Sequence, residues 1–394
     1  MKNHLLHFVL VLLAFPFASI SQAAEVKEWN FLVFINGVNN LDRFGKMNIN
    51  QMEEVGSSDK MNILVQWGSL ANPNTTRLLV QKDNDKTNVT SPIVQNLGNV
   101  DMGDYRELIR FVEWAQQNYP AKKYFITVWN HGSGWNIVRA NGTEIRPTDI
   151  SYDDRTNNHI TTEQLATAMA ESAKIIGHKV DIYASDACLM GMVEVASQMQ
   201  DSVSYFLGSQ DNEPGEGWPY AHFLRQWAPK VDQLSAKEVT QLHAKEYLTA
   251  YSPGGVYRAS EVTMSAFDLS KISAYESAIR RVSTYLQSLN SADLTKARQA
   301  VSATKQFGYA NFYDIVDYVS QLEKKGLNNP SFSALRQAQQ DFVIANEQNQ
   351  DQNTYGVSVW IATGYNYRAD ANRYNALEFN KNSQWGGFLN VLNK

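Results

Sequence analysis

The chain's single cysteine and one of its seven histidines follow two similar strand-like runs. His131 comes shortly after the apolar run 124–129, and Cys188 comes shortly after the apolar run 180–184. A thiol next to an imidazole can act as a nucleophile, because the imidazole takes up the thiol proton and the thiolate attacks a carbonyl carbon. We therefore predict that Cys188 is a catalytic nucleophile and that His131 is its partner.

Residues next to this pair complete the expected chemistry. Gly132 has no side chain, so its backbone N–H can approach a developing oxyanion. A helix predicted to begin near Leu189 would point backbone N–H groups at the sulfur, and this helix end and His131 would both lower the pKa of the thiol. The alternatives are structural: a lone cysteine is often a buried small hydrophobe, and a histidine beside glycines is often only a turn residue.

The elements that must position these residues alternate along the chain. Short β-branched and aromatic runs predict buried strands at 31–35, 62–65, 124–129 and 180–184. Helical patterns lie at 105–118, at 161–176 after a cap at Thr162, and at 189–199. This alternation predicts an α/β fold, with a central mostly parallel sheet sandwiched by helices. Functional groups collect at the carboxyl ends of such strands, so His131 and Cys188 meet if their strands are neighbours.

The chain divides into three predicted parts. Residues 1–23 have the features of a secretory signal peptide, with Lys2 before an apolar run of 8–17 and small residues after it, so we expect a secreted or periplasmic protein. An uncleaved signal anchor is the alternative. Residues 24–226 form the α/β catalytic core, and residues 227–394 form a helix-rich C-terminal part packed on it. That part contains strand-like runs at 261–267 and 355–361.

Composition and motifs exclude several other classes of function. The net charge of −5 gives no nucleic-acid footprint, and no later segment has the length of a membrane span. The sequence has no His-x-x-x-His pair, no cysteine-rich ligand set, no Gly-x-Ser-x-Gly elbow and no P-loop. Ser133 stands between two glycines, but the sequence offers no base to activate it as a nucleophile.

Several separate motifs resemble the clostripain family, the C11 group of cysteine peptidases. They lie at 100–104, 118–121, 128–135, 185–192 and 213–220, and a weaker similarity lies at 355–358. The resemblance implies a caspase-like fold, a dyad of His131 and Cys188, and endopeptidase cleavage after Arg or Lys in protein or peptide substrates. It also implies that Asp186 lines the pocket for the basic side chain; capping of the following helix is the alternative role.

One motif departs from the family pattern. Relatives often have Ser-Glu-Glu-Thr-Glu-Pro where this chain has Ser-Gln-Asp-Asn-Glu-Pro at 209–214, so one carboxylate is lost and another is moved. Asp211, in this segment, is the second substrate-binding candidate. Calcium dependence is known in parts of the family. No segment here identifies calcium ligands, and the thiol mechanism requires no cofactor.

The segment 137–159 is polar and carries three arginines, which predicts an exposed loop open to cleavage. Relatives are known to mature by a cut in this interval, so we expect self-processing after Arg139 or Arg146. The alternative is that these arginines solvate the loop or pair with its aspartates. The alternative to an enzyme is a secreted binding protein that keeps the peptidase fold without turnover.

Overall fold

A nine-stranded sheet runs through the protein, and its five central strands are parallel. The computed structural model describes residues 25–394 except 137–138, 141–142, 145–148, 309–310 and 351–352, and it describes only the backbone of 139–140 and 143–144. The strand order is β15-β12-β11-β10-β5-β1-β2-β3-β4. The parallel strands are β1 (Lys27–Gly37), β2 (Met61–Ser69), β5 (Ala121–Trp129), β10 (Val180–Asp186) and β11 (Val203–Gly208).

Antiparallel strands complete both edges of this sheet. They are β3 (Thr75–Leu79) and β4 (Ile93–Gly98) at one edge, and β12 (Thr263–Asp268) and β15 (Val343–Gln348) at the other. Two hairpins outside the sheet follow β5, namely β6 (Arg139–Ala140) with β7 (Thr143–Glu144) and β8 (Ile150–Asp153) with β9 (Asn158–Ile160).

The sheet separates two apolar cores, because both faces of its central strands are buried. In β1, Leu32 and Phe34 belong to one core, whereas Phe31, Val33 and Ile35 belong to the other. Burial of each such side chain contributes about 1.5–3 kcal/mol, which explains why near-continuous apolar runs form the central strands. The predicted α/β class with a mostly parallel sheet sandwiched by helices is confirmed.

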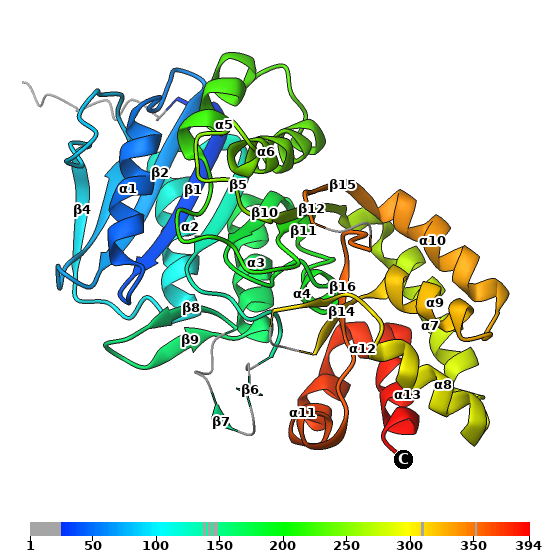
Figure 1. Cartoon of the computed structure of the whole chain (residues 1–394). Coiled ribbons are helices and arrows are strands. Elements are labelled where there is room, and N and C mark those ends of the chain that lie inside the picture. The colour runs from blue at the N-terminus through cyan, green and yellow to red at the C-terminus, as the bar shows by residue number, and fades with distance from the viewer. Residues whose placement is uncertain (1–24, 137–138, 141–142, 145–148, 309–310, 351–352) are drawn as a thin grey trace, which may run out of the picture.

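Helices cover both faces of the sheet (Figure 1). α2 (Tyr105–Asn118) and α3 (Thr162–Ile176) cover one face, and α1 (Asp42–Glu53), α5 (Tyr220–Trp227) and α6 (Ala236–Tyr251) cover the other. α3 begins with a capping box in which Thr161 and Gln164 exchange hydrogen bonds. The cap of this helix is therefore Thr161 and not Thr162.

The C-terminal part supplies two strands of the main sheet and most of the remaining helices. Several of these helices lie beyond the β15 edge (Figure 1), and all of them share the core of α2 and α3. They are α7 (Ile272–Gln287), α8 (Ser291–Val301), α9 (Ile315–Lys324), α10 (Pro330–Phe342), α11 (Gly364–Ala376), α12 (Glu378–Ser383) and α13 (Trp385–Leu392), with short 3-10 turns at Ala228–Lys230 and Leu269–Lys271. A small sheet joins β13 (Gln306–Phe307), β14 (Phe312–Asp314) and β16 (Ser358–Trp360). The boundary at residues 226 and 227 stays a prediction.

Candidate active site

His131 and Cys188 occupy equivalent positions beyond two neighbouring strands. β5 and β10 are parallel partners, and their last register pair joins Trp129 to Asp186. The Asn130 N–H donates to the Asp186 carbonyl at 3.2 Å, so the two chains still run side by side as they leave the sheet. His131 and Cys188 each follow this register pair at the same carboxyl edge, and the structure brings the two predicted residues together.

Both residues line one pocket of about 300 Å³. The ends of β5 and β10 form one wall of this pocket, and the segment before α5 forms the other. The lining residues are Leu41, Trp129, Asn130, His131, Asp186, Ala187, Cys188, Asn212, Glu213, Pro214, Gly215 and Gly217. A thiol, an imidazole and two carboxyls therefore share one concave site.

The imidazole of His131 is oriented by a residue that the sequence did not single out. Nε2 of His131 lies 2.7 Å from Oδ1 of Asn40, in the loop that follows β1. Asn39 fixes this loop, because its side chain donates to the Tyr152 carbonyl at 3.0 Å and accepts from the Leu41 N–H at 2.9 Å. An amide oxygen only accepts hydrogen bonds, so this contact places the proton on Nε2 and leaves Nδ1 as the basic nitrogen.

Gly132 is packed directly against the loop of the cysteine. A Cβ at this position would lie 2.5 Å from the Cys188 carbonyl oxygen and 2.9 Å from the Ala187 Cβ. Both contacts are too close for a side chain, and one of them is with backbone that cannot easily move. Only glycine therefore fits where the two strand ends meet. The lack of a side chain also lets its N–H approach the site closely.

Cys188 lies in a turn and not at the start of a helix, which corrects the sequence prediction. α4 (Val193–Gln198) begins well after the cysteine, and Leu189 has a positive φ of 65°. The sulfur accepts instead from the Glu213 N–H at 3.3 Å. Burial raises the pKa of the Cys188 thiol, and this N–H offsets the shift only in part. The predicted helix start beside the sulfur is therefore wrong, and burial shifts the thiol pKa in the direction opposite to the predicted lowering.

Asp186 lies at the floor of the pocket and is 4% exposed. The Tyr220 hydroxyl donates to its Oδ2 at 2.7 Å, and the Trp218 N–H donates to the same oxygen at 3.4 Å. Burial raises the pKa of Asp186 to about 7, and these hydrogen bonds counteract part of the shift. α4 begins too far from Asp186 for this carboxylate to cap it, so the alternative role as a helix cap is excluded.

Glu213, and not Asp211, supplies the second carboxyl of the pocket. The Asp211 carboxylate accepts from the Gly308 N–H at 3.1 Å and from Nε2 of Gln350 at 2.9 Å, and Asp211 is not among the residues that line the pocket. Its role is to tie loops together, which corrects the prediction of a substrate contact. Glu213 is the first residue of the family motif at 213–220, and this motif is the signal in the sequence that points to it.

The predicted cleavage positions lie at the limits of the described structure. Arg146 lies outside the described residues. Arg139 is the first residue of β6, of which only the backbone is described. The described residues on either side of 137–148 both contact α11. Nδ2 of Asn136 donates to Asp370 at 3.0 Å, and Arg373 forms ion pairs with Asp149 and Glu163.

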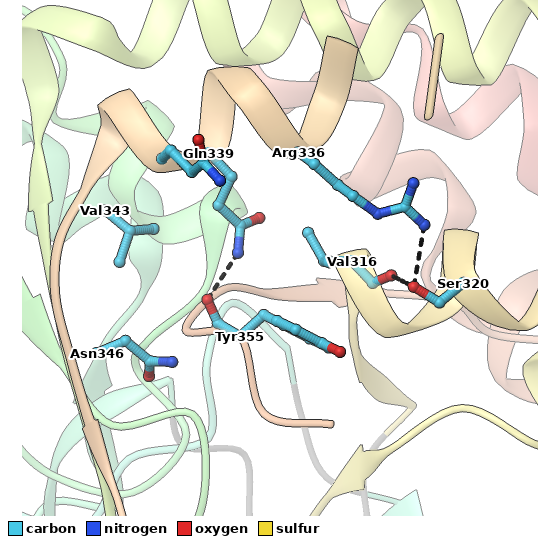
Figure 2. Close-up of a pocket in the computed structure, with 8 residues that line it drawn as sticks. Val316, Ser320, Arg336, Gln339, Val343, Asn346 and Tyr355 are labelled. Atoms are coloured by element: carbon cyan, nitrogen blue, oxygen red, sulfur yellow. Dashed lines mark hydrogen bonds between the residues drawn. The ribbon is translucent and has the colours of Figure 1, made fainter. Parts of the chain in front are cut away.

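A second pocket, of about 440 Å³, lies between α9, α10 and β15 (Figure 2). Its charged side chain, Arg336, forms an ion pair with Glu323 and donates to Oγ of Ser320 at 3.1 Å. Nε2 of Gln339 donates to the Tyr355 carbonyl at 2.7 Å across the same pocket. These groups are engaged with one another, and the pocket holds no thiol or imidazole for acyl-transfer chemistry.

The residues that the structure describes offer neither a metal centre nor a membrane span. No group of three or more His, Cys, Asp or Glu side chains is arranged to hold a metal ion. No helix in the described ranges is long and apolar enough to cross a membrane. The predicted signal peptide falls outside the described residues, and calcium binding stays a prediction.

Comparison with known proteins agrees with this geometry. The clostripain family model matches residues 33–391. Clostripain of Hathewaya histolytica is 36% identical over 99 residues, which are 25% of this chain and 18% of clostripain. The chain therefore matches less than a fifth of the length of this curated relative.

Two solved structures have the same fold. A secreted C11 cysteine protease of Bacteroides thetaiotaomicron, solved with an irreversible peptide inhibitor, superposes with a TM-score of 0.66 at 22% identity, over 91% of this chain and 99% of its own. An inactive zymogen C11 protease of Parabacteroides distasonis superposes with a TM-score of 0.69 at 18% identity, over the same shares of the two chains.

The fold is that of the C11 proteases, and the pocket combines a thiol with an imidazole. With a family model matched along almost the whole described chain, the protein belongs to the clostripain family, and so to the cysteine-type peptidases.

Proposed function

We propose that this protein is an endopeptidase that cleaves after basic residues, with Cys188 as nucleophile and His131 as general base. The observation that carries the proposal is the pairing of Trp129 with Asp186 in the sheet. His131 and Cys188 follow these two residues and line one pocket, which the Asp186 carboxylate also lines. One relative named above is a C11 cysteine protease in complex with an irreversible peptide inhibitor, which agrees with this chemistry.

The proposed reaction has two stages. Nδ1 of His131 takes the proton of the Cys188 thiol, and Sγ attacks the carbonyl carbon of the scissile bond. The Gly132 N–H donates to the oxyanion of the tetrahedral intermediate. The imidazolium gives its proton to the leaving amine, and a water molecule activated by His131 then hydrolyses the acyl-enzyme.

The raised pKa of the thiol fits this sequence of events. A protonated Cys188 is unreactive until its proton passes to His131, so the nucleophile is generated when a substrate fills the pocket and excludes water. Asp186 supplies the charge that selects Arg or Lys, and the Tyr220 hydroxyl holds that carboxylate in place.

Export and self-processing complete the proposal. The sequence features of residues 1–23 and the secreted relative support a secreted or periplasmic enzyme. The arginines between the two proposed catalytic residues support a cut after Arg139 or Arg146. Because β5 and β10 remain neighbours in one sheet, the two fragments would stay together.

Covalent labelling tests this function against a binding protein without turnover. Folded protein is treated with a peptidyl ketone that has an arginyl side chain, and with a matched norleucyl ketone as control. We expect one arginyl label per chain at Cys188, located by peptide mass spectrometry, and slower labelling by the control. Folded, processed protein that takes up neither reagent would support the binding protein.

A further inference from the structure

Two carboxyl groups line the pocket of about 300 Å³, and they lie close enough for each to shift the pKa of the other. Asp186 comes from the end of β10, and Glu213 comes from the segment before α5. Both Glu213 carboxyl oxygens are buried, although the residue as a whole is partly exposed. Two ionised carboxylates in contact inside a protein repel each other strongly, so such pairs hold a proton between them.

The hydrogen-bond donors around the pair are distributed unequally. Asp186 accepts from the Tyr220 hydroxyl and from the Trp218 N–H. In the described structure neither Glu213 oxygen accepts a hydrogen bond of good geometry, and the Ala187 N–H only partly offsets the raised pKa of Glu213. Donors stabilise the ionised form of a carboxyl, so the negative charge belongs on Asp186 and the proton on Glu213.

The tyrosines around the pair and the nearby His243 do not supply a compensating charge. Among the described residues, no Lys or Arg is among the groups that shift the pKa of either carboxyl. The titratable groups that line the pocket or interact with the pair and its neighbours are His131, Cys188, Glu216, Tyr220, Tyr247, Tyr251 and Tyr257. His243 packs on Trp218, with the ring centroids 3.9 Å apart. Burial holds the tyrosines and His243 in their neutral forms, with the pKa of His243 lowered to about 3.

We propose that Glu213 works as a protonated acid that donates a hydrogen bond to Asp186, so that the specificity pocket presents one negative charge and not two. Glu213 is then a positioning residue, and Asp186 is the ion that pairs with the substrate. This inference rests on the proposed preference for basic residues. One guanidinium or ammonium group neutralises the pocket without any change in the protonation of Glu213.

The test compares Glu213→Gln with Asp186→Asn on arginyl and citrullyl peptide substrates, which differ in charge but hardly in shape. Glutamine keeps a donor toward Asp186 and has no charge. Rates for both substrates can fall in Glu213→Gln, because the Glu213 N–H also contacts Cys188. The ratio of the two kcat/KM values should stay within about threefold of wild type. Asp186→Asn should lower that ratio at least about 30-fold.

The pH dependence of this ratio distinguishes a donor from an anion. The midpoint is the pH at which the ratio has risen halfway to its maximum. If Glu213 donates a hydrogen bond to Asp186, this midpoint should be unchanged in Glu213→Gln. It should move to higher pH in Glu213→Met, which cannot donate. If Glu213 were a second anion, its loss would lower the pKa of Asp186, and the midpoint would move to lower pH in both variants. That result would overturn the inference, as would a fall of the ratio in Glu213→Gln as large as in Asp186→Asn.

A spectroscopic measurement separates this inference from the proposed specificity. A wild type without preference for arginyl over citrullyl substrates contradicts the specificity but not the protonation of Glu213. The infrared difference spectrum of wild type minus Glu213→Gln at neutral pH should then show the C=O stretch of a protonated carboxylic acid. Its absence would overturn the inference whatever the specificity.

Discussion

The Nε2 atom of His131 lies 2.7 Å from the Oδ1 atom of Asn40, which comes from the loop after β1. β1 is the neighbour of β5 on the side away from β10. This contact therefore connects the loop after β1 to the ends of β5 and β10, which carry His131 and Cys188. The Asn40 oxygen thereby favours a proton on Nε2 of His131, and the proposed mechanism uses the other ring nitrogen, Nδ1, to take up the thiol proton.

Replacing Asn40 should therefore impair catalysis more than binding. In Asn40→Ala, the imidazolium that forms during the reaction loses a hydrogen bond, and a bond to a charged group is worth about 1.5–3 kcal/mol. We expect kcat to fall about 10- to 150-fold, with KM changed by less than about threefold. Steady-state kinetics on an arginyl amide check this. Asn40→Asp is the matched control, because its carboxylate keeps an acceptor and should retain most of kcat. A loss confined to KM would show that Asn40 contacts substrate.

Gly132 should tolerate no side chain. In Gly132→Ala, the added Cβ would lie 2.5 Å from the Cys188 carbonyl, so the two loops must separate and the N–H leaves its place. Removing one oxyanion donor costs about 100- to 1000-fold in kcat, and we expect a loss of this size in a single-turnover assay. Ser133→Ala serves as the control and also tests the alternative nucleophile. It should keep wild-type activity, and its inactivity would revive the serine alternative.

The preference for basic substrates should increase with pH. Burial raises the pKa of Asp186 to about 7, so the carboxyl is neutral below this pH and ionised above it. The ratio of kcat/KM for arginyl over citrullyl substrates should therefore be low at pH 5.5 and rise through a midpoint near pH 7. In Tyr220→Phe the lost hydrogen bond raises the pKa of Asp186 further, and the midpoint should move up. A ratio that is flat with pH in the wild type would remove Asp186 from this role.

Self-processing should depend on Cys188 and leave the fragments together. Purified wild type is expected to yield two fragments on denaturing gels, with a new N-terminus after Arg139 or Arg146. Cys188→Ala should stay intact. Size exclusion should show one particle before and after the cut, because Asn136 and Asp149 remain attached to α11 through Asp370 and Arg373. An uncut wild-type chain with full activity would refute a requirement for the cut.

Much of the fold could be predicted from the sequence because its signals are local. The runs in β1, β5 and β10 are short and rich in apolar and β-branched residues. Such runs favour a buried strand in any parallel sheet. The strand ends that carry His131 and Cys188 follow directly from those runs. The pairing of Trp129 with Asp186 depends on the order of strands in the sheet, which no local pattern specifies, and only the structure shows it.

The errors arose where tertiary contacts override local preference. The pattern of 189–199 is helical, but Gly191 packs on the backbone of Ser209 and donates to its carbonyl at 2.6 Å, which holds the chain out of a helix until Val193. Asp211 was assigned to the pocket, but its partner Gln350 is distant in sequence. Asn40 gave no signal of its own, because an asparagine after a strand is usually only a turn residue.

The measurement that tests the central claim most directly is the hydrolysis of a small arginyl amide by freshly purified Cys188→Ala and His131→Ala. Circular dichroism and thermal unfolding are recorded beside the wild type to show that both variants fold. Cys188→Ala should have no activity above background, and His131→Ala should lose about 100- to 10,000-fold in kcat/KM, the usual contribution of general acid–base catalysis. Cleavage by folded Cys188→Ala at the wild-type rate would contradict the mechanism.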